Sequence, residues 1–237
     1  MIAPAKRRGR AGTTAIGLYA GPMPFHPHPR LSPTPDIQID SDERVWDGRF
    51  PLDVVRFRHR RFDGAFSGTK TWELWRRGTA AAVLPYDPWQ DALVLIEQFR
   101  LPAYAAGLDP VMVEMPAGLC DAGEAPERTA TREIQEEMHL ATDRLEPVGR
   151  YLLTAGGSDE LCTLFAGRVR APAADAQGIA GYAGMAAEQE DIRIRVWPAD
   201  RAIAAALAGA VPNSVAAIAL LWLAARRDWL RQQWLAS

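Results

Sequence analysis

Three glutamates are spaced so that their carboxylates meet on one side of a predicted helix. Glu133, Glu136 and Glu137 stand at positions i, i+3 and i+4, which places their side chains within about 6 Å of one another. Carboxylates this close repel each other, and the repulsion grows when they are desolvated, so they need a compensating cation. Oxygen ligands in this number select Mg²⁺ or Mn²⁺ rather than zinc. The alternative is a solvent-exposed acidic helix with Arg128 and Arg132 as intrahelical partners.

The glutamates belong to a longer pattern, in which a glycine-rich loop leads into the helix. The segment resembles the Nudix box, where a glycine, five residues, a glutamate and seven residues precede R-E-U-x-E-E-x-G-U, with U aliphatic. The matching positions are Gly118, Glu124, Arg132, Glu133, Ile134, Glu136, Glu137 and Leu140. His139 replaces a glycine that usually ends the helix with a positive φ. Histidine tolerates that conformation at some strain, so we expect a small loss of stability and no loss of catalysis.

The resemblance to Nudix hydrolases implies a Mg²⁺ site in which Mn²⁺ can substitute. The implied metal ligands are the Ala117 carbonyl, Glu133, Glu137 and Glu190. Glu136 is implied as a catalytic group that shares a metal. Glu124 and Arg132 are expected to pair and so to fix the loop against the helix.

Segments outside the box narrow the resemblance to the ADP-ribose pyrophosphatase subgroup, over the chain from about Val54 to its end. These segments are Thr71–Arg77, Glu97–Tyr104, Glu114–Gly118, Gly156–Glu160 and Gly184–Ile192. Recognition of ADP-ribose requires an aromatic surface for adenine, a polar group for its amine and guanidinium groups for the diphosphate. The sequence supplies residues of all three kinds.

The resemblance also assigns substrate-binding residues. Trp72 would stack on adenine, Glu73 and Arg77 would contact the base end, Arg100 would hold phosphate, and Glu160 is a further substrate-binding residue. The alternative for Trp72 is a core aromatic on a sheet face. Because members of the subgroup exchange N-terminal β-elements in a homodimer, Trp72 and Glu73 are candidates to serve the partner's site.

An acidic loop precedes a predicted strand at 192–197. By resemblance, Glu188 is the general base that activates water, and Glu190 approaches the metals or supports the loop. Such a loop can close over substrate. A solvated acidic loop is the alternative, and about five more residues than expected lie between Glu160 and Gly184.

The predicted activity is therefore Mg²⁺-dependent hydrolysis of ADP-ribose to AMP and ribose 5-phosphate. Two alternatives remain at this point. The first is hydrolysis of another nucleoside diphosphate sugar such as GDP-mannose, because the box cleaves the diphosphate and says little about what flanks it. The second is a sensor that binds ADP-ribose without cleaving it. In such a protein we would expect a degraded box and a basic DNA-binding appendage.

The elements that must position these residues are strands followed by helices. Two strands are predicted on either side of Asp63-Gly64, followed by strands at 79–84 and 92–96, and these four are expected to be consecutive antiparallel strands. Three more strands are predicted near 148–153, 161–169 and 192–197. A helix runs from Pro126 to about Met138, and two helices close the chain. The last begins at Asn213, a good N-cap, with an apolar stripe of Val215, Ile218, Leu221, Trp222 and Trp229.

The resemblance implies an α+β fold, a Nudix α/β/α sandwich with a mixed central sheet, preceded by an N-terminal antiparallel β subdomain. We predict a Pro/Arg-rich disordered tail at 1–38, the β subdomain for dimerisation and base recognition at 39–77, and the hydrolase domain at 78–237. Seven of the 18 prolines lie in the tail region, which has no helical or strand periodicity. Met23 is an alternative native start.

Charge and composition exclude several classes. The net charge is −2, but the first 35 residues hold five basic and no acidic residues, leaving 22 basic against 29 acidic residues in the remainder. An acidic body argues against nucleic acid as a partner. The longest apolar run, 215–225, is 11 residues, too short to span a membrane. With two cysteines and no secretory signal, the expected location is the cytoplasm.

Overall fold

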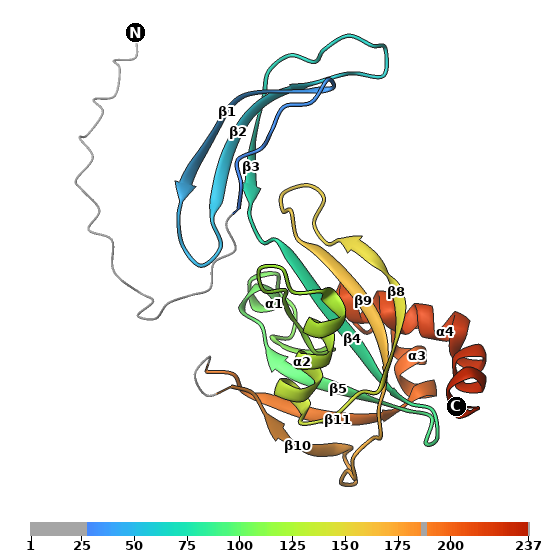
Figure 1. Cartoon of the computed structure of the whole chain (residues 1–237). Coiled ribbons are helices and arrows are strands. Elements are labelled where there is room, and N and C mark those ends of the chain that lie inside the picture. The colour runs from blue at the N-terminus through green and yellow to red at the C-terminus, as the bar shows by residue number, and fades with distance from the viewer. Residues whose placement is uncertain (1–27, 186–188, 237) are drawn as a thin grey trace.

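The chain forms two separate β-sheets joined by a short link (Figure 1). The computed structural model describes residues 28–185 and 189–236. The first sheet is antiparallel, in the order β1 (Ile37–Trp46), β2 (Leu52–His59) and β3 (Lys70–Trp75). It is the N-terminal β subdomain of the predicted fold class. The boundary predicted at residue 38 falls inside β1, and Arg30 and Leu31 of the preceding segment already hydrogen-bond to Asp42.

The second sheet is mixed. Its main path runs β10-β11-β5-β4-β9-β8, with β6 beside β5 and β7 beside β4. The strands are β4 (Thr79–Asp87), β5 (Ala92–Phe99), β6 (Val111–Glu114), β7 (Ala117–Leu119), β8 (Arg144–Leu152), β9 (Leu161–Arg168), β10 (Ile179–Ala183) and β11 (Ile192–Pro198). Only the β4–β9 pair is parallel among the described pairs.

Helices cover both faces of this sheet (Figure 1). The helices are α1 (Leu101–Ala105), α2 (Pro126–Met138), α3 (Ala199–Leu207) and α4 (Ser214–Leu235). Ala130 and Ile134 of α2 pack on Val83, Val94 and Ile96 of the sheet. On the other face, α3 and α4 pack against a second cluster that includes the buried strand residues Leu84, Leu93 and Leu164. The predicted α/β/α sandwich is confirmed.

The predicted carboxylate helix is confirmed at both ends. Pro126 is its first residue, where proline loses no hydrogen bond. Met138 is its last, because His139 adopts a left-handed conformation with φ of 57°. The His139 N–H bonds to the Gln135 carbonyl at 3.0 Å. The expected positive φ therefore occurs on a residue with a Cβ.

The apolar stripe predicted for the last helix is right for three of its five residues, and the predicted cap is confirmed. The Asn213 side chain accepts a hydrogen bond from the Ala216 N–H at 2.9 Å. The residues that α4 buries are Ala216, Ala219, Leu220, Leu223, Leu230 and Trp234. Leu221 and Trp229 are exposed, while Val215, Ile218 and Trp222 are partly buried beside the core. Since the first half of α4 is apolar all round, its composition does not select one face.

The prediction that the strands up to Phe99 are consecutive antiparallel neighbours is wrong. β3 and β4 lie in different sheets, and the sequence pattern did not indicate β1, β6, β7, β10 or α1 as separate elements. A buried ion pair and backbone bonds tie the sheets together. Arg76 bonds Asp53 of β2 at 3.3 Å and Asp159 of the β8–β9 loop at 2.7 Å, and the Trp75 N–H donates to the Gly157 carbonyl at 2.8 Å.

No helix in the described part of the chain is long and apolar enough to cross a membrane.

Candidate active site

Two glutamates of α2 lie buried against the sheet. Glu133 and Glu137 are 7% and 5% exposed, which contradicts the alternative of a solvated acidic helix. Burial, together with neighbouring carboxylates, raises the pKa of Glu133 to about 7 and of Glu137 to about 9. The Oε2 atom of Glu137 is buried and has no hydrogen-bond partner among the described residues.

Gly118 leaves room for one of these carboxylates. A Cβ at Gly118 would lie 1.8 Å from Oε1 of Glu133, so any side chain here would displace the carboxylate. The φ of Gly118 is not positive, and the need for glycine therefore comes from close approach alone. The neighbouring Ala117 opens β7 opposite Ala82, and its backbone hydrogen-bonds to Glu137.

Arg132 connects the remaining acidic residues of the helix and the loop. Its guanidinium bonds Glu133 at 2.7 Å and Glu136 at 2.9 Å, and it lies 3.4 Å from Glu124. The predicted Glu124–Arg132 pair is thus present. A hydrogen bond from the Asp121 backbone, assisted by Arg132, lowers the pKa of Glu124 to about 2. This carboxylate remains charged and fixes the loop against the helix.

The donor set fits a hard divalent cation. Glu133 and Glu137 are one helical turn apart and buried, one oxygen of Glu137 is unpaired, and the Ala117 backbone lies beside it. Across residues 28–185 and 189–236, no three His, Cys, Asp or Glu side chains form a ready-made metal site. Mg²⁺ usually binds one or two carboxylates and keeps several waters, so two glutamates are a sufficient protein contribution.

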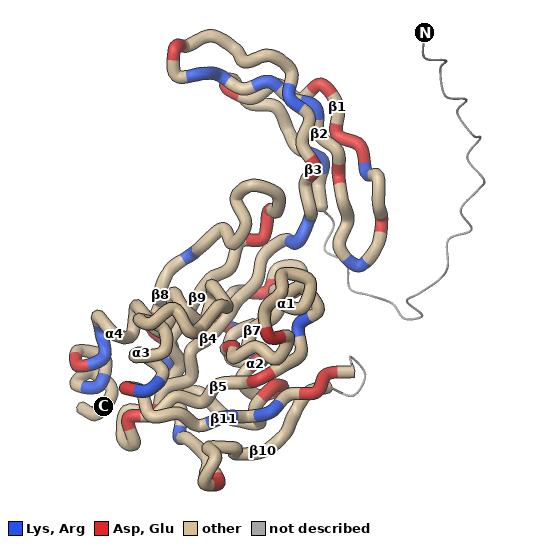
Figure 2. The backbone as a smooth tube through the Cα atoms, turned by 180° about the vertical axis from the view of Figure 1, so that it is seen from behind, with Lys and Arg blue, Asp and Glu red and all other residues tan. Residues whose placement is uncertain are grey.

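The loop between β10 and β11 contributes a further carboxylate. The charge of Glu190 raises the pKa of Glu137 and of Glu133, so Glu190 lies near both. Figure 2 shows acidic positions along α2 and also among the residues just before β11. Glu188, the predicted general base, lies outside the described residues.

Arg100 faces the same acidic group. It follows β5, and its charge interacts with Glu137 and Glu190. Its Nε and Nη2 atoms donate to one oxygen of Glu114, at 2.9 and 2.7 Å. Glu114 is 6% exposed. Glu133, Glu137 and Glu190 form a carboxylate cluster, and the arrangement therefore places one guanidinium group at the edge of this cluster.

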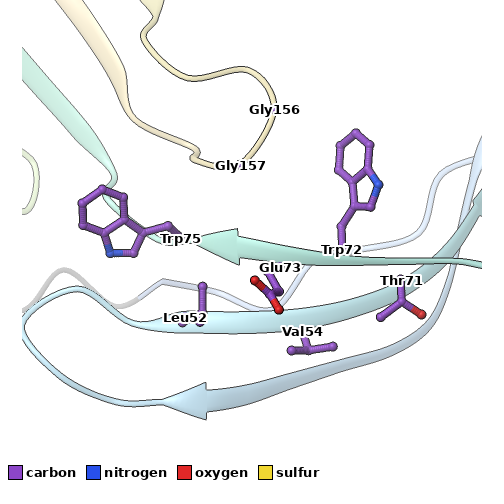
Figure 3. A pocket seen from close by; sticks show the side chains of 8 residues that line it. All are labelled: Leu52, Val54, Thr71, Trp72, Glu73, Trp75, Gly156 and Gly157. Carbon is purple, nitrogen blue, oxygen red and sulfur yellow. The ribbon is translucent and has the colours of Figure 1, made fainter. Parts of the chain in front are cut away.

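A second group of predicted residues lines a pocket of about 550 Å³ between the N-terminal sheet and the β8–β9 loop (Figure 3). Its lining residues are Leu52, Val54, Thr71, Trp72, Glu73, Trp75, Gly156 and Gly157. Trp72 is 51% exposed, so it is no core aromatic. Neighbouring residues of a strand point to opposite faces, and Figure 3 shows Trp72 and Glu73 directed away from each other.

Arg77 and Glu160 bind each other at the junction of the two sheets. Their ion pair measures 3.0 Å. The Arg77 guanidinium also stacks over Phe50, 3.8 Å from the ring centroid, and lies 4.9 Å from the Trp75 ring. Trp75, 44% exposed, joins the pocket.

The predicted residues thus fall into two groups in one chain. Ala117, Glu133, Glu136, Glu137, Glu190 and Arg100 surround the carboxylate cluster, whereas Trp72, Glu73, Arg77 and Glu160 lie at or beside the pocket. The sequence analysis named neither Glu114 nor Trp75 as a site residue. Alternation along β3 could have indicated Trp75, because it shares the face of Glu73.

Comparisons with known proteins find relatives that match over most of the chain. The NUDIX domain model matches residues 76–210. An Escherichia coli K12 protein named ADP-ribose pyrophosphatase is 39% identical over 199 residues, 84% of this chain and 93% of the relative. A Haemophilus influenzae protein of the same name is 36% identical over 205 residues, 85% and 92% of the two chains.

More distant matches concern a different substrate and the fold. A Yersinia pestis protein named GDP-mannose pyrophosphatase is 33% identical over 132 residues, which is 55% of this chain and 64% of the relative. A solved structure described as an ADP compounds hydrolase superposes with a TM-score of 0.59 at 19% identity, over 86% of this chain and 98% of the other. At this identity the superposition shows the shared fold.

Proposed function

The chain belongs to the Nudix family and to its ADP-ribose pyrophosphatase subgroup, and on this premise we propose that it hydrolyses ADP-ribose to AMP and ribose 5-phosphate with Mg²⁺. The observation that carries the chemistry is the buried pair of Glu133 and Glu137 within the matched box. The Escherichia coli and Haemophilus influenzae relatives support the substrate, because the similarity extends over most of both chains.

Glu133, Glu137 and the Ala117 carbonyl would hold the cation, with Glu190 as a further ligand. When bound, Mg²⁺ neutralises phosphate oxygens and lowers the pKa of a coordinated water; Mn²⁺ has the same ligand preference. Glu136 is proposed to share a metal on the basis of the family resemblance, and Arg132 ties its carboxylate to that of Glu133. Two buried carboxylates without a cation repel each other, so cation binding also relieves the electrostatic strain of the site.

The other residues orient substrate and move the proton. Arg100 binds the diphosphate, because its guanidinium supplies paired donors next to the carboxylate cluster. Glu188 remains the proposed general base on the basis of the family resemblance, taking a proton from the attacking water. Glu190 supports this loop, since its carboxylate accepts a hydrogen bond from the Met185 N–H at 3.2 Å.

The pocket on the N-terminal sheet is the proposed site for the adenine end. Trp72 and Glu73 both line this pocket, where Trp72 stacks on the base and Glu73 contacts the base end, and the Arg77–Glu160 ion pair lies beside it at the junction of the two sheets. We further propose a homodimer in which this pocket serves the partner's carboxylate cluster. Exposed large apolar side chains on the first sheet and around α1 support an interface: Trp46, Trp72, Trp75, Leu101 and Tyr104.

GDP-mannose is the second candidate substrate. The Yersinia pestis relative favours it, but the similarity covers only 55% of this chain. A non-catalytic sensor is disfavoured because the carboxylates of the box are present and buried. A cytoplasmic location is also a proposal, supported by two free, buried cysteines, Cys120 and Cys162.

The decisive experiment measures release of AMP and ribose 5-phosphate from ADP-ribose, beside GDP-mannose, with Mg²⁺ and with EDTA. We expect Mg²⁺-dependent preference for ADP-ribose, and a loss of at least about a hundredfold in kcat for Glu133→Gln or Glu137→Gln. Glu127→Gln is the matched control, because Glu127 is exposed on the same helix. Near-parental turnover in both site variants would disprove the metal assignment, and turnover of GDP-mannose alone would disprove the substrate.

A further inference from the structure

The cap of the C-terminal helix reaches into the candidate active site. Asn213 uses both ends of its side-chain amide. Its Oδ1 accepts from the Ala216 N–H at 2.9 Å, which caps α4, and its Nδ2 donates to Oε1 of Glu114 at 2.9 Å. A cap requires only the oxygen, so the second hydrogen bond is not explained by helix capping.

Glu114 links Asn213 to Arg100, because it is hydrogen-bonded to both. The Glu114 side chain is 8% exposed and ends β6. Its Oε1 bonds Asn213, and its Oε2 accepts both hydrogen bonds from Arg100, at 2.9 and 2.7 Å. Both carboxylate oxygens are therefore engaged, each by a different element, and the carboxylate has one orientation in which all three bonds are made.

This orientation decides where the Arg100 guanidinium points. With Nε and Nη2 held by Glu114, Nη1 has no hydrogen-bond partner within the described ranges. The guanidinium remains partly exposed and within electrostatic reach of Glu137 and Glu190. Its unpaired edge is thus available to an anionic ligand that approaches the carboxylate cluster with its cation.

We propose that Asn213 is a positioning residue for Arg100, acting through Glu114, so that the cap of α4 sets the geometry of diphosphate binding. The inference rests on the proposed function, in which Arg100 binds the diphosphate. If Asn213 loses its amide donor, Glu114 Oε1 is left buried without a partner, and an unsatisfied buried acceptor is expensive. The carboxylate then turns toward other donors and takes the guanidinium with it.

Reversing the donor and acceptor provides a sharp test. Asn213→Asp keeps the cap and the size of the side chain but places a carboxylate against Glu114. Asn213→Asp combined with Glu114→Gln restores a hydrogen bond of opposite direction, from the Gln amide to Asp, while the Gln oxygen still accepts from Arg100. The double variant also has the parental net charge.

The readout is affinity for a non-hydrolysable ADP-ribose analogue with a methylene-bridged diphosphate, measured by calorimetry with Mg²⁺, beside KM and kcat for ADP-ribose. We expect Asn213→Asp to weaken analogue binding and raise KM by about tenfold. The double variant should recover most of this loss. In urea unfolding, Asn213→Asp should be less stable than the parent, because buried Glu114 loses its donor. The double variant should unfold close to the parent, because its hydrogen bond is restored and aspartate caps a helix as well as asparagine does.

Asp200→Asn is the control, since it removes an ion pair between α3 and Arg227 of the same helix α4. It should leave affinity and KM unchanged. Equal affinity in the parent and Asn213→Asp, or a loss that the double variant does not recover, would overturn the inference. A parent that binds the analogue but cleaves nothing contradicts the proposed function alone, because the affinity comparison still tests the positioning role.

Discussion

The charge of Glu137 is strongly affected by the fold. Its carboxyl is buried, one of its oxygens has no partner among the described residues, and it faces Glu133 and Glu190. Without a cation, burial and like charges raise its pKa from its ordinary range to about 9. The folded metal-free protein therefore holds a proton that the unfolded chain releases near its ordinary pKa.

This raised pKa predicts a pH-dependent stability. Both states are protonated below the unfolded pKa, so the contribution to stability is complete there and is lost as pH rises toward about 9. In EDTA, the free energy of unfolding of the parent should fall as pH rises over this window. In Glu137→Gln this free energy should depend less on pH, and at pH 8 it should be about 1–3 kcal/mol higher than in the parent. Urea denaturation at three pH values measures this, with Glu127→Gln as control. Identical slopes for the parent and Glu137→Gln would contradict it.

Gly118 gives a second prediction at the scale of single residues. Its missing Cβ leaves the space that the Glu133 carboxylate occupies, 1.8 Å from where a Cβ would lie. Gly118→Ala should lower kcat by at least about tenfold, because the carboxylate must move away from its partner Glu137. Gly68→Ala is the control, since no atom lies within 4 Å of a Cβ there. Unchanged turnover with Gly118→Ala would show that Glu133 can shift without consequence.

At the scale of elements, the helix that carries the carboxylates ends on a strained residue. His139 has a φ of 57° where glycine has no Cβ penalty. The helix nevertheless ends in the expected place, since its last N–H still bonds the Gln135 carbonyl. The substitution by histidine therefore affects the energy of the cap, whereas the position of Glu137, two residues earlier, is kept.

His139→Gly should stabilise the protein by about 0.5–1 kcal/mol, because glycine adopts the left-handed conformation without strain. Thermal unfolding measures the change. His139→Ala separates the backbone effect from loss of the imidazole, since alanine keeps the Cβ and should be no more stable than the parent. A gain for alanine equal to that for glycine would assign the effect to the ring instead.

At the scale of the whole molecule, the base pocket and the carboxylate cluster are built from different parts of the chain. The pocket belongs to β2, β3 and the β8–β9 loop, while the cluster belongs to α2, β7 and the residues before β11. The buried pairs of Arg76 with Asp53 and Asp159 hold the first sheet against the second. This division allows one protomer to complete the site of another.

The proposed dimer predicts complementation. A Trp72→Ala/Glu73→Ala variant and a Glu137→Gln variant should each be nearly inactive on ADP-ribose. After subunit exchange in a 1:1 mixture, about a quarter of parental activity should return, since half of the dimers contain one intact composite site. Sedimentation verifies the dimer and the exchange. Activity no greater than the mean of the two variants, despite exchange, would place base and metal sites in the same protomer.

The sequence by itself determined how the candidate site residues are arranged within one helix and its preceding loop. The spacing of Glu133, Glu136 and Glu137 and the glycine at 118 depend on helical periodicity and chain connectivity, which are local properties. The helix bounds and the Asn213 cap followed for the same reason, whereas the Glu124–Arg132 pair was implied by the family resemblance. Residues that are close in sequence have their relative positions fixed as soon as the element forms.

Only the tertiary structure decided the contacts between distant segments. Asn213 bonds Glu114, which lies 99 positions earlier in the chain. This contact forms because β6 pairs with β5 in the sheet and because α4 packs on the sheet face that α2 does not cover. The buried face of α4 was likewise undetermined by its sequence, since apolar residues surround its first half and packing selected Ala216, Ala219 and Leu220. Such choices depend on which surfaces meet, and periodicity along one segment carries no information about its partner.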